Sequence, residues 1–425
     1  MSAERDVATG HGALTNWAGN YRYAAPRILR PASVEEVQEA VAGGRRVRAL
    51  GTRHSFTGLP DTDGELLTLD RLPLEIEVDP DQRTVGLAAS ARYGDLVDVL
   101  HGSGWALANL ASLPHISVAG AVATGTHGSG DGNRSLAAAV RSIELVTADG
   151  ELRTVRRGDP DFDGSVVGLG ALGIVVRLVL DVEPAYDVRQ SVFTGLGWDA
   201  LAGHFDEITR SAYSVSLFTH WTDTAIEQAW LKSRADEAPR EELFGAVPAR
   251  ETLHMLPGGP PEAVTRQGGI SGPWHARLPH FRMEFTPSRG DELQSEYLLP
   301  RANAIRAFEE LRRLAEAMAP VLQVCEIRTV AAEPLWLSGS FERDVVGLHF
   351  TWYREPDEVY AVLPRLEAAL MPLGARAHWG KCFVASAEEI AAAYPRLGDF
   401  RALRDRVDPD DKFGNDTLDR LLGRR

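Results

Sequence analysis

The sequence predicts an α+β protein built from two domains. Its 425 residues exceed the size, about 250–300 residues, at which one hydrophobic core usually stops growing. Up to about residue 185 the chain is dense in short β-branched runs interrupted by glycine, whereas from 186 to 375 glycine becomes rarer and aromatic residues increase. We therefore expect a first domain over residues 1–185, a second over residues 186–375, and a C-terminal segment over residues 376–425 whose attachment the pattern leaves open.

The first domain is predicted to mix strands and helices. Residues 33–44 predict a helix in which Ser33 is the N-cap and Glu36 completes a capping box. Residues 93–104 predict a second helix that ends at glycine. Five β-branched runs predict strands, namely RVRALG (46–51), LLTLD (66–70), TVGLAAS (84–90), IELVTADG (143–150) and GIVVRLVLDVEP (173–184).

The second domain is predicted to combine strands with one long helix over residues 302–319. Residues 234–275 are rich in proline, glycine and charge, which predicts a long loop and not an independent unit. In the C-terminal segment, residues 387–407 read as a helical run. The strand candidates are YSVSLFTHW (213–221), EQAWLKS (227–233), RMEFTP (282–287), CEIRTV (325–330) and VVGLHFTWY (345–353).

Composition disfavours several classes of function. The 60 acidic and 45 basic side chains give a formal net charge of −15, which disfavours binding to nucleic acid or to an anionic membrane. No run of about 18 apolar residues is present and residues 1–12 lack a secretory signal, so we expect a cytoplasmic protein without a membrane partner. We also expect a monomer. Cys325 and Cys382 lack the spacing of a zinc site, so we expect free thiols and no metal.

Two glycine-rich loops, residues 48–58 (RALGTRHSFTG) and 109–130 (NLASLPHISVAGAVATGTHGSG), are candidates for binding an anionic ligand. Small residues allow the backbone to approach a ligand closely, and consecutive backbone N–H groups form concavities that suit a pyrophosphate. Tight turns in a glycine-rich sheet would explain either loop alone equally well.

Residues 168–173, GLGALG, match the dinucleotide-binding pattern G-x-G-x-x-G on paper. That motif requires a helix after its glycines, whereas here the β-branched run 173–184 predicts a strand. We therefore expect no nicotinamide-binding turn at this position.

Two pairs of polar residues lie on predicted strands of the second domain. Glu326 and Arg328 are two residues apart, as are His349 and Thr351, so each pair shares one face of its strand. Such pairs usually mark the solvated side of a half-exposed sheet. Removing a proton and a hydride from an alcohol, in contrast, requires cationic or basic groups around the reacting oxygen, which these residues could supply.

The order and content of the two loops resemble the vanillyl-alcohol oxidase superfamily, in which a G-x-x-H-S loop precedes an S-V-x-G-x-x-A-T-G-x-H-G loop. From TNWAGN at residue 15 to DPDDKFGND at residue 416 the chain resembles alditol oxidases of the xylitol or sorbitol type. The resemblance implies a two-domain fold, with FAD bound by the first domain and the returning C-terminal segment, and a second domain that binds the substrate.

His54 matches the histidine that carries FAD covalently in this family. A neutral imidazole can attack the activated 8α-methyl carbon of the flavin, and Leu113 and Pro114 stand where doubly linked relatives have Cys-Pro, so single linkage is expected. Many relatives have glycine in place of Arg53, so the turn could differ there. The resemblance places these further residues along the FAD: Gly51, Thr52, Arg53, Ser55, Ser112, Ser117, Val118, Gly120, Thr124, Gly125, His127, Gly128, Gly173, Ile174 and Val175.

The resemblance also implies a polyol site and its chemistry. Arg328 and Lys381 would stabilise the alkoxide that develops at C1 while its hydride passes to the flavin, and Glu326 would keep these cations paired. The expected products are the aldose and hydrogen peroxide, with oxygen as the oxidant. The residues expected to contact the polyol are Ser112, Glu326, Arg328, His349, Thr351 and Lys381.

Three other functions remain open from the sequence. A sugar-lactone (aldonolactone) oxidase or dehydrogenase of the same superfamily would share the flavin-binding loops but not necessarily the substrate groups. A zinc hydrolase using His54, His115 and His127 is disfavoured because these residues lack paired ligand spacing. A flavin store or a sugar-binding protein without activity would leave Arg328 and Lys381 unexplained.

Overall fold

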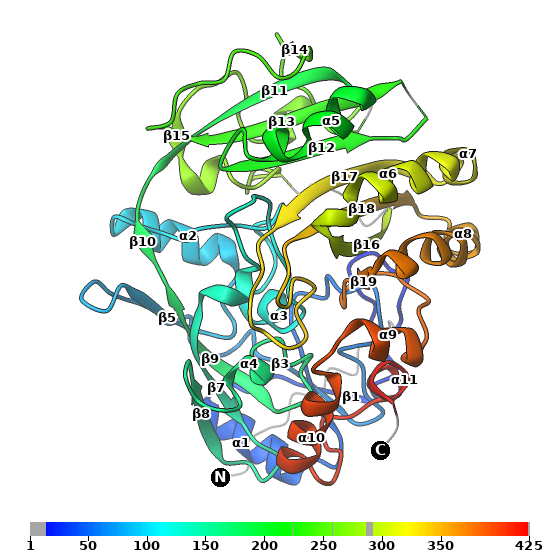
Figure 1. Ribbon diagram of the computed structural model, residues 1–425. Coiled ribbons are helices and arrows are strands. Elements are labelled where there is room, and N and C mark those ends of the chain that lie inside the picture. The colour runs from blue at the N-terminus through cyan, green and yellow to red at the C-terminus, as the bar shows by residue number, and fades with distance from the viewer. Residues whose placement is uncertain (1–13, 223, 257, 286–291, 424–425) are drawn as a thin grey trace.

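The computed structural model describes residues 14–222, 224–256, 258–285 and 292–423. The polar residues 1–12 of the sequence lie outside this part of the chain. In Figure 1, the β-sheets formed by residues 27–184 lie at one end of the molecule together with the C-terminal helices, and a single large sheet occupies the other end. This arrangement is α+β, as the sequence predicts.

Two larger sheets and one two-stranded sheet form the lower end of the molecule in Figure 1. Strands β1, β3 and β2 pair in parallel in that order. A five-stranded antiparallel sheet has the order β4-β5-β9-β7-β8. The five runs predicted as strands all contain strands. The bounds are β1 Arg27–Leu29, β2 Val47–Leu50, β3 Glu65–Thr68, β4 Ile76–Asp79, β5 Thr84–Ala88, β7 Val140–Val146, β8 Leu152–Arg156 and β9 Ile174–Asp181, with β6 Trp105–Ala106 pairing β10 Glu183–Pro184.

Both predicted helices of this region are present. In α1 (Val34–Gly43) the hydroxyl of Ser33 accepts a hydrogen bond from the backbone N–H of Glu36, which confirms the N-cap. The carboxylate of Glu36 accepts from the N–H of Ala32, one residue before the cap, so the reciprocal half of the capping box is displaced. Helix α2 (Tyr93–Gly102) ends at glycine as predicted, and α3 (Val118–Ala123) and α4 (Phe162–Ser165) are short.

The large sheet has nine strands with the order β14-β11-β13-β12-β17-β18-β16-β19, and β15 also pairs with β11. The RMEFTP strand prediction is wrong. Arg282 N–H donates to Ala263 O, and Phe285 N–H donates to Arg282 O in a turn, so residues 282–285 anchor the long loop, and residues 286–287 lie outside the described chain. The strand bounds are β11 Asp187–Gly197, β12 Ser214–Thr219, β13 Ala225–Arg234, β14 Val247–Pro248, β15 Gly272–Pro273, β16 Glu292–Pro300, β17 Leu322–Val330, β18 Val345–Tyr353 and β19 Arg376–Ala377.

Helices and the long loop cover this sheet. The predicted helix over residues 302–319 is two helices, because the backbone at Leu314 (φ −92°, ψ −2°) leaves helical geometry. The loop 234–275 carries Met255 and Val264 into a buried cluster with sheet residues such as Trp230, so it covers part of the sheet and is not only a surface excursion. The helix bounds are α5 Trp198–Thr209, α6 Ala304–Arg313, α7 Ala315–Met318 and α8 Pro356–Leu370.

The C-terminal segment packs against the sheets formed by residues 27–184. Its predicted helix is split into α9 (Ala387–Ala393) and α10 (Leu397–Val407) because Pro395 cannot donate a helical hydrogen bond. After α10, Lys412 O accepts from Val47 N–H at 2.9 Å, which joins this segment to β2. Asn415 caps α11 (Asp416–Leu422) and donates its amide to three carbonyls of residues 58–61.

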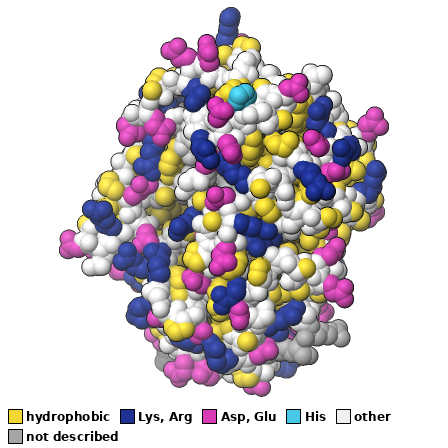
Figure 2. All heavy atoms as spheres, in the orientation of Figure 1, with side chains coloured by type: hydrophobic (Ala, Val, Ile, Leu, Met, Phe, Trp, Pro, Cys, Tyr) yellow, Lys and Arg dark blue, Asp and Glu magenta, His cyan; other side chains and the backbone are white. Residues whose placement is uncertain are grey.

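Figure 2 shows acidic and basic side chains interspersed with scattered hydrophobic ones on the face seen in Figure 1. Exposed large hydrophobic residues are spread over many elements, from Leu74 to Val384. None of the helices among the described residues is long and apolar enough to cross a membrane.

Candidate active site

The two glycine-rich loops lie side by side. Loop 51–55 follows β2, and Thr52 joins it to the second loop because its hydroxyl accepts from Ser117 N–H at 3.2 Å. A Cβ on either Gly51 or Gly120 would lie 2.7 Å from Ser117 Oγ, so both positions require glycine for this approach. The exposed backbone of Gly51 and Gly120 is therefore available to a ligand.

Arg53 adopts the left-handed conformation, with φ of 63°. The turn thus keeps the backbone geometry that glycine adopts easily, although arginine occupies it. Arg53 O accepts from Trp17 N–H at 2.8 Å, and the ring of Trp17 stacks on His54 with centroids 5.3 Å apart. A left-handed residue inside such a loop favours the concave array of N–H groups that binds anions.

His54 is held as a neutral imidazole. Its Nδ1 lies 3.0 Å from Thr52 Oγ1. Burial, followed by the nearby His115, lowers the pKa of His54 to about 4. The ring therefore keeps a free lone pair at neutral pH, which nucleophilic attack on a cofactor requires.

The remaining residues predicted along the cofactor fall into two groups. Gly128 and Gly173 are places where the backbone packs closely, since a Cβ there would lie 2.5 Å from Leu110 O and 2.7 Å from Val146 O respectively. His127 points elsewhere, toward the charged cluster described next. The side chains of Val118 and Ile174 lie in the hydrophobic core, so only their backbone can face a ligand. Two side chains bond to the backbone: Ser55 Oγ donates to Gly380 O, and Thr124 Oγ1 donates to Gly120 O. Gly125 has a φ of 67°, and the side chain of Val175 is half-buried.

A buried carboxylate, Glu296 on β16, joins the charged residues of the second region. Its oxygens lie 2.6 Å from Arg328 Nη2 and 2.7 Å from Lys381 Nζ. His127 Nε2 lies 3.2 Å from Oε1, and His349 Nδ1 lies 3.5 Å from Oε2. Burial by itself raises the pKa of Glu296, but Arg328 and Lys381 together hold that pKa well below its ordinary value. Glu296 is therefore an anion.

Strand register places the predicted substrate residues on one face of the sheet. His349 on β18 lies opposite Glu296 on β16 and opposite Glu326 on β17. These three residues form one cross-strand row, because directly paired residues point to the same side. Arg328 lies two residues after Glu326 on β17, and Thr351 lies two residues after His349 on β18, so both point to this same face. Thr351 Oγ1 lies 3.4 Å from His349 Nε2. The predicted strand pairs are thus brought together.

Lys381 reaches this row from the turn after β19. Its ammonium contacts His349 Nδ1 as well as Glu296. The preceding Gly380 O accepts from Phe56 N–H at 2.8 Å, two residues beyond His54. Burial, followed by the charge of Arg328, lowers the pKa of Lys381, and Glu296 opposes this shift. The lysine turn therefore connects the charged row to the first glycine-rich loop.

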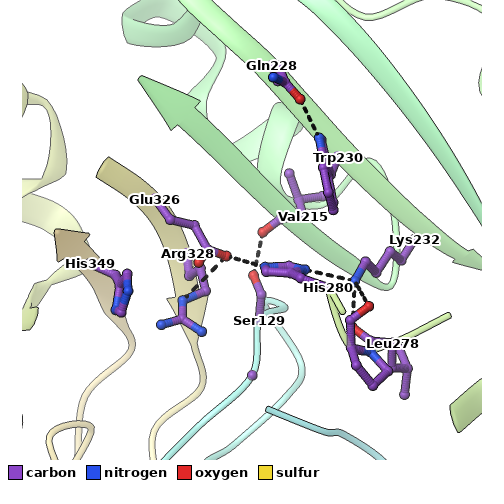
Figure 3. A network of polar contacts seen from close by, with 12 residues as sticks. Ser129, Val215, Gln228, Trp230, Lys232, Leu278, His280, Glu326, Arg328 and His349 are labelled. Atoms are coloured by element: carbon purple, nitrogen blue, oxygen red, sulfur yellow. Dashed lines mark hydrogen bonds and ion pairs between the residues drawn. The ribbon is translucent and has the colours of Figure 1, made fainter. Parts of the chain in front are cut away.

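Glu326 also accepts a hydrogen bond from His280, which lies just after the long loop 234–275. His280 Nε2 lies 2.7 Å from Glu326 Oε1, and its Nδ1 lies 3.0 Å from the buried Lys232 Nζ (Figure 3). Ser112 O accepts from the N–H groups of both His280 and Phe281, at 3.2 and 3.3 Å. Ser112 of the second glycine-rich loop therefore lies beside this histidine.

Sequence reasoning missed Glu296, His280 and Lys232. Lys232 stands among apolar residues in the strand AWLKS, which was a readable signal, because a buried charge requires a partner. Glu296 was missed because the strand was expected at 282–287 instead of β16. His280 lies in a loop whose path the sequence pattern does not indicate.

The three histidines of the zinc alternative have separate surroundings. His54 stacks on Trp17, His115 Nε2 lies 3.0 Å from Met283 O, and His127 faces Glu296. The described residues contain no group of three or more His, Cys, Asp or Glu that could hold a metal ion.

Comparison with known proteins extends the resemblance seen in the sequence. A model described as FAD binding domain matches residues 25–156, and one described as D-arabinono-1,4-lactone oxidase matches residues 287–421. The chain is 51% identical to an alditol oxidase from a Streptomyces species, over 96% of this chain and 99% of that one. It is 28% identical to an L-gulono-1,4-lactone dehydrogenase from Mycobacterium tuberculosis, over 96% of this chain and 99% of the relative. Cholesterol oxidase from B. sterolicum shares the fold, with a TM-score of 0.79 at 17% identity over 98% of both chains.

The fold and the FAD-binding match define a FAD-dependent oxidoreductase of the vanillyl-alcohol oxidase type, with a FAD-binding domain and a second domain. The predicted fold class is confirmed. The 51% identity over nearly the full length is more specific: the chain belongs to the alditol oxidase family. The loops fit this cofactor, because glycine at 51 and 120 leaves the backbone accessible and His54 is neutral.

The buried histidines make the stability of the protein depend on pH. Burial is the largest cause that lowers the pKa of both His280 and His349 to about 4, below the ordinary value near 6.5. Between these pH values the unfolded chain binds protons that the folded chain does not, so stability falls as pH decreases from about 6.5 toward 4. At pH 5 each of these histidines should lower the free energy of unfolding by about 2 kcal/mol relative to neutral pH.

We expect the Tm to fall between pH 7 and pH 5, and to fall less steeply in His349→Gln, because that variant lacks one of the titrating groups. Differential scanning calorimetry at both pH values measures the two slopes. An equal slope in the variant and the parent would contradict the assignment of His349 as a buried neutral imidazole.

Proposed function

We propose that this protein oxidises the terminal C1 hydroxyl of alditols such as xylitol or sorbitol to the aldose and reduces O2 to H2O2. The observation that carries this proposal is the pair of buried cations, Arg328 and Lys381, held by one carboxylate beside the FAD-binding loops. FAD supplies the acceptor for the hydride of the alcohol carbon and passes the electrons to oxygen. The 51% identity to an alditol oxidase supports the same substrate class.

The cations are suited to stabilise negative charge on the reacting oxygen. Among the described residues, Arg328 Nε is buried without a hydrogen-bond partner and lies 3.6 Å from Glu326 Oε1, so the hydrogen-bonding capacity of this guanidinium is not fully used. Lys381 lies on the other side of Glu296. Preorganised donors of this kind stabilise charge that develops in the transition state more than charge in the ground state. We assign Arg328 and Lys381 to the developing alkoxide.

Hydrogen bonds to the other hydroxyls are assigned to Glu326, Ser112, Thr351 and His349. Glu326, His349 and Thr351 lie on adjacent strands, and Ser112 is tied to the neighbouring His280 segment. A site built from such groups rejects a substrate that lacks the matching hydroxyl more strongly than an apolar pocket rejects one with an extra methylene. Alditols of different length should therefore react, whereas the hydroxyl pattern should matter.

The FAD is assigned to residues 1–185 together with 376–425, and the polyol to residues 186–375. The contacts of Lys412 and Asn415 with β2 and residues 58–61 support the return of the C-terminal segment to the FAD-binding loops. Lys381 belongs by position to the C-terminal segment, so both parts contribute to the substrate site.

The alternative is an aldonolactone oxidase or dehydrogenase, favoured by the lactone oxidase model that matches residues 287–421. The lactone-oxidising relatives that match over 96% of this chain are more distant, at 28% identity or less, and a D-arabinono-1,4-lactone oxidase at 31% identity matches over only 54% of it. Steady-state turnover of xylitol and of an aldonolactone, each under oxygen and with an artificial electron acceptor, distinguishes the two. We expect xylitol with oxygen to give the higher kcat/KM and stoichiometric peroxide; preference for the lactone would overturn the proposal.

We propose that the FAD is attached covalently through His54 alone. His54→Ala should abolish acid-stable flavin, because the neutral imidazole that forms the proposed bond is lost. Flavin absorbance that remains in the acid-precipitated protein measures attachment. His115→Gln, in the adjacent loop, is the matched control and should retain it. Covalent flavin in the His54 variant would show that another residue forms the bond.

Lys381→Ala should reduce kcat/KM for xylitol by about 10² or more, because a donor to transition-state charge is lost. Lys381→Arg keeps the positive charge and should retain more activity. Steady-state oxygen consumption measures both, and the flavin spectrum shows that each variant is loaded. Near-normal turnover of Lys381→Ala would remove this residue from the mechanism.

We further propose that the protein acts in the cytoplasm as a monomer. Buried free thiols at Cys325 and Cys382 are compatible with a reducing compartment, and exposed hydrophobic side chains are scattered. Light scattering coupled to size-exclusion chromatography should give the mass of one chain, and a dimer mass would contradict the monomer.

A further inference from the structure

Lys232 on β13 is a buried ammonium group that the roles proposed above do not use. It is 1% exposed. Its Nζ lies 2.5 Å from Leu278 O, 2.9 Å from Pro279 O and 3.0 Å from His280 Nδ1 (Figure 3). An ammonium has three protons and no lone pair. These three acceptors therefore use all of its hydrogen-bonding capacity.

This arrangement determines the tautomer of His280. Because Lys232 can only donate, Nδ1 of the imidazole must accept, and the ring proton must lie on Nε2. Nε2–H then donates to Glu326 Oε1 at 2.7 Å. Burial, with the charge of Lys232, lowers the pKa of His280 to about 4, so the ring is neutral and carries only this one proton.

The histidine leaves Glu326 with one free oxygen. Oε1 accepts from His280 and lies 3.6 Å from Arg328 Nε. Within the described part of the chain, Oε2 accepts no hydrogen bond. Arg328 and His280 together hold the pKa of Glu326 below its ordinary value despite burial, so the carboxylate is ionised. A carboxylate in this state can only accept, and a substrate hydroxyl is the donor it matches.

The surroundings of His280 restrict its movement. Its backbone N–H donates to Ser112 O, and its carbonyl accepts from Thr265 N–H at 2.9 Å. The rings of Trp230 and Phe218 lie edge-on to the imidazole, with centroids 5.3 and 5.6 Å away. The imidazole therefore presents Nε2 to Glu326 in one orientation.

We propose that Lys232 and His280 are positioning residues for the substrate: Lys232 fixes the tautomer of His280, and His280 holds Glu326 so that Oε2 accepts a hydrogen bond from one hydroxyl of the polyol. This inference rests on the proposed alditol oxidation. Neither residue needs to touch the substrate. Their loss should weaken substrate binding and hydroxyl selectivity while leaving the chemical step at C1 largely intact.

Replacing His280 tests the hydrogen bond to Glu326. The amide nitrogen of Gln occupies nearly the place of Nε2, so His280→Gln keeps the donor, whereas His280→Asn and His280→Leu lose it. We expect KM for xylitol to rise about tenfold in the Asn and Leu variants, with kcat changed less than about threefold, and to stay within about threefold of the parent in His280→Gln. His254→Gln, at another buried histidine, in the long loop 234–275, is the matched control.

Selectivity gives a second measurement. Xylitol should be compared with its monodeoxy analogues in the parent, where one analogue should lose about 10² or more in kcat/KM. In His280→Leu the ratio of kcat/KM for xylitol to kcat/KM for that analogue should shrink by about tenfold, because Glu326 is no longer held in place.

The pH dependence and the tautomer test the part played by Lys232. The charged and titratable groups that face it are His280 on the loop and Glu326 and Arg328 on β17, while its partners on β11 and β12, Gln190 and Ser214, are uncharged. Burial lowers the pKa of Lys232 to about 7. A neutral amine would turn its lone pair toward Nδ1 and so disfavour the Nε2–H tautomer.

KM in the parent should therefore rise as pH increases through about 7, and this rise should be absent in Lys232→Met. ¹⁵N spectra of histidine-labelled protein, with the signal of residue 280 assigned by its loss in His280→Gln, should show Nε2–H in the parent at pH 6 and a changed tautomer in Lys232→Met. This measurement does not depend on turnover.

The outcomes separate two failures. If the parent does not oxidise alditols, the proposed function is wrong, whatever the spectra show. If the parent oxidises xylitol but His280→Leu and His280→Asn keep the KM and selectivity of His254→Gln, the positioning role is wrong. An Nδ1–H tautomer in the parent at pH 6 would also overturn it, even where Lys232→Met fails to fold.

Discussion

The buried carboxylate of Glu296 is the group on which the candidate site depends. Arg328 and Lys381 each contact it, and without it the only carboxylate described beside these two buried cations would be Glu326, 3.6 Å from Arg328 Nε. Removing one partner of a buried ion pair typically costs about 3–5 kcal/mol, because the other charge stays desolvated. Glu296 also joins different parts of the chain, since it binds one cation from β17 and one from the turn after β19.

Around this carboxylate the backbone connects the charged row to the cofactor loops. Gly380 O accepts from Phe56 N–H on one side, and Ser112 O accepts from the His280 segment on the other. These bonds involve main-chain atoms, so they fix the distance between the two regions independently of side-chain rotamers. The left-handed conformation of Arg53 lowers the stability of the fold by roughly 1–2 kcal/mol relative to an ordinary conformation. This strained residue lies in the turn that carries His54.

Burial and neighbouring charges determine which titratable groups of the candidate site are neutral and which are ionised. His54, His280 and His349 stay neutral because desolvation disfavours their cationic form. Glu296 remains ionised because Arg328 and Lys381 lie within hydrogen-bond distance, and Glu326 because Arg328 lies close by and His280 donates a hydrogen bond to it. The same region can therefore offer a nucleophilic imidazole to the flavin, acceptors to hydroxyl groups and cations to a developing alkoxide.

Local sequence determined most of the secondary-structure types, the helix cap at Ser33, the two glycine-rich loops and the strand pairs Glu326/Arg328 and His349/Thr351, because these follow from spacing and backbone preference over a few residues. The cofactor assigned to the loops and the substrate class assigned to the strand pairs came from the resemblance to a family. Only the tertiary structure brought in Glu296, His280 and Lys232. Their partners lie on other strands or loops, for example 85 residues away in the pair Glu296 and Lys381, and such contacts depend on sheet order and register, which local patterns do not encode.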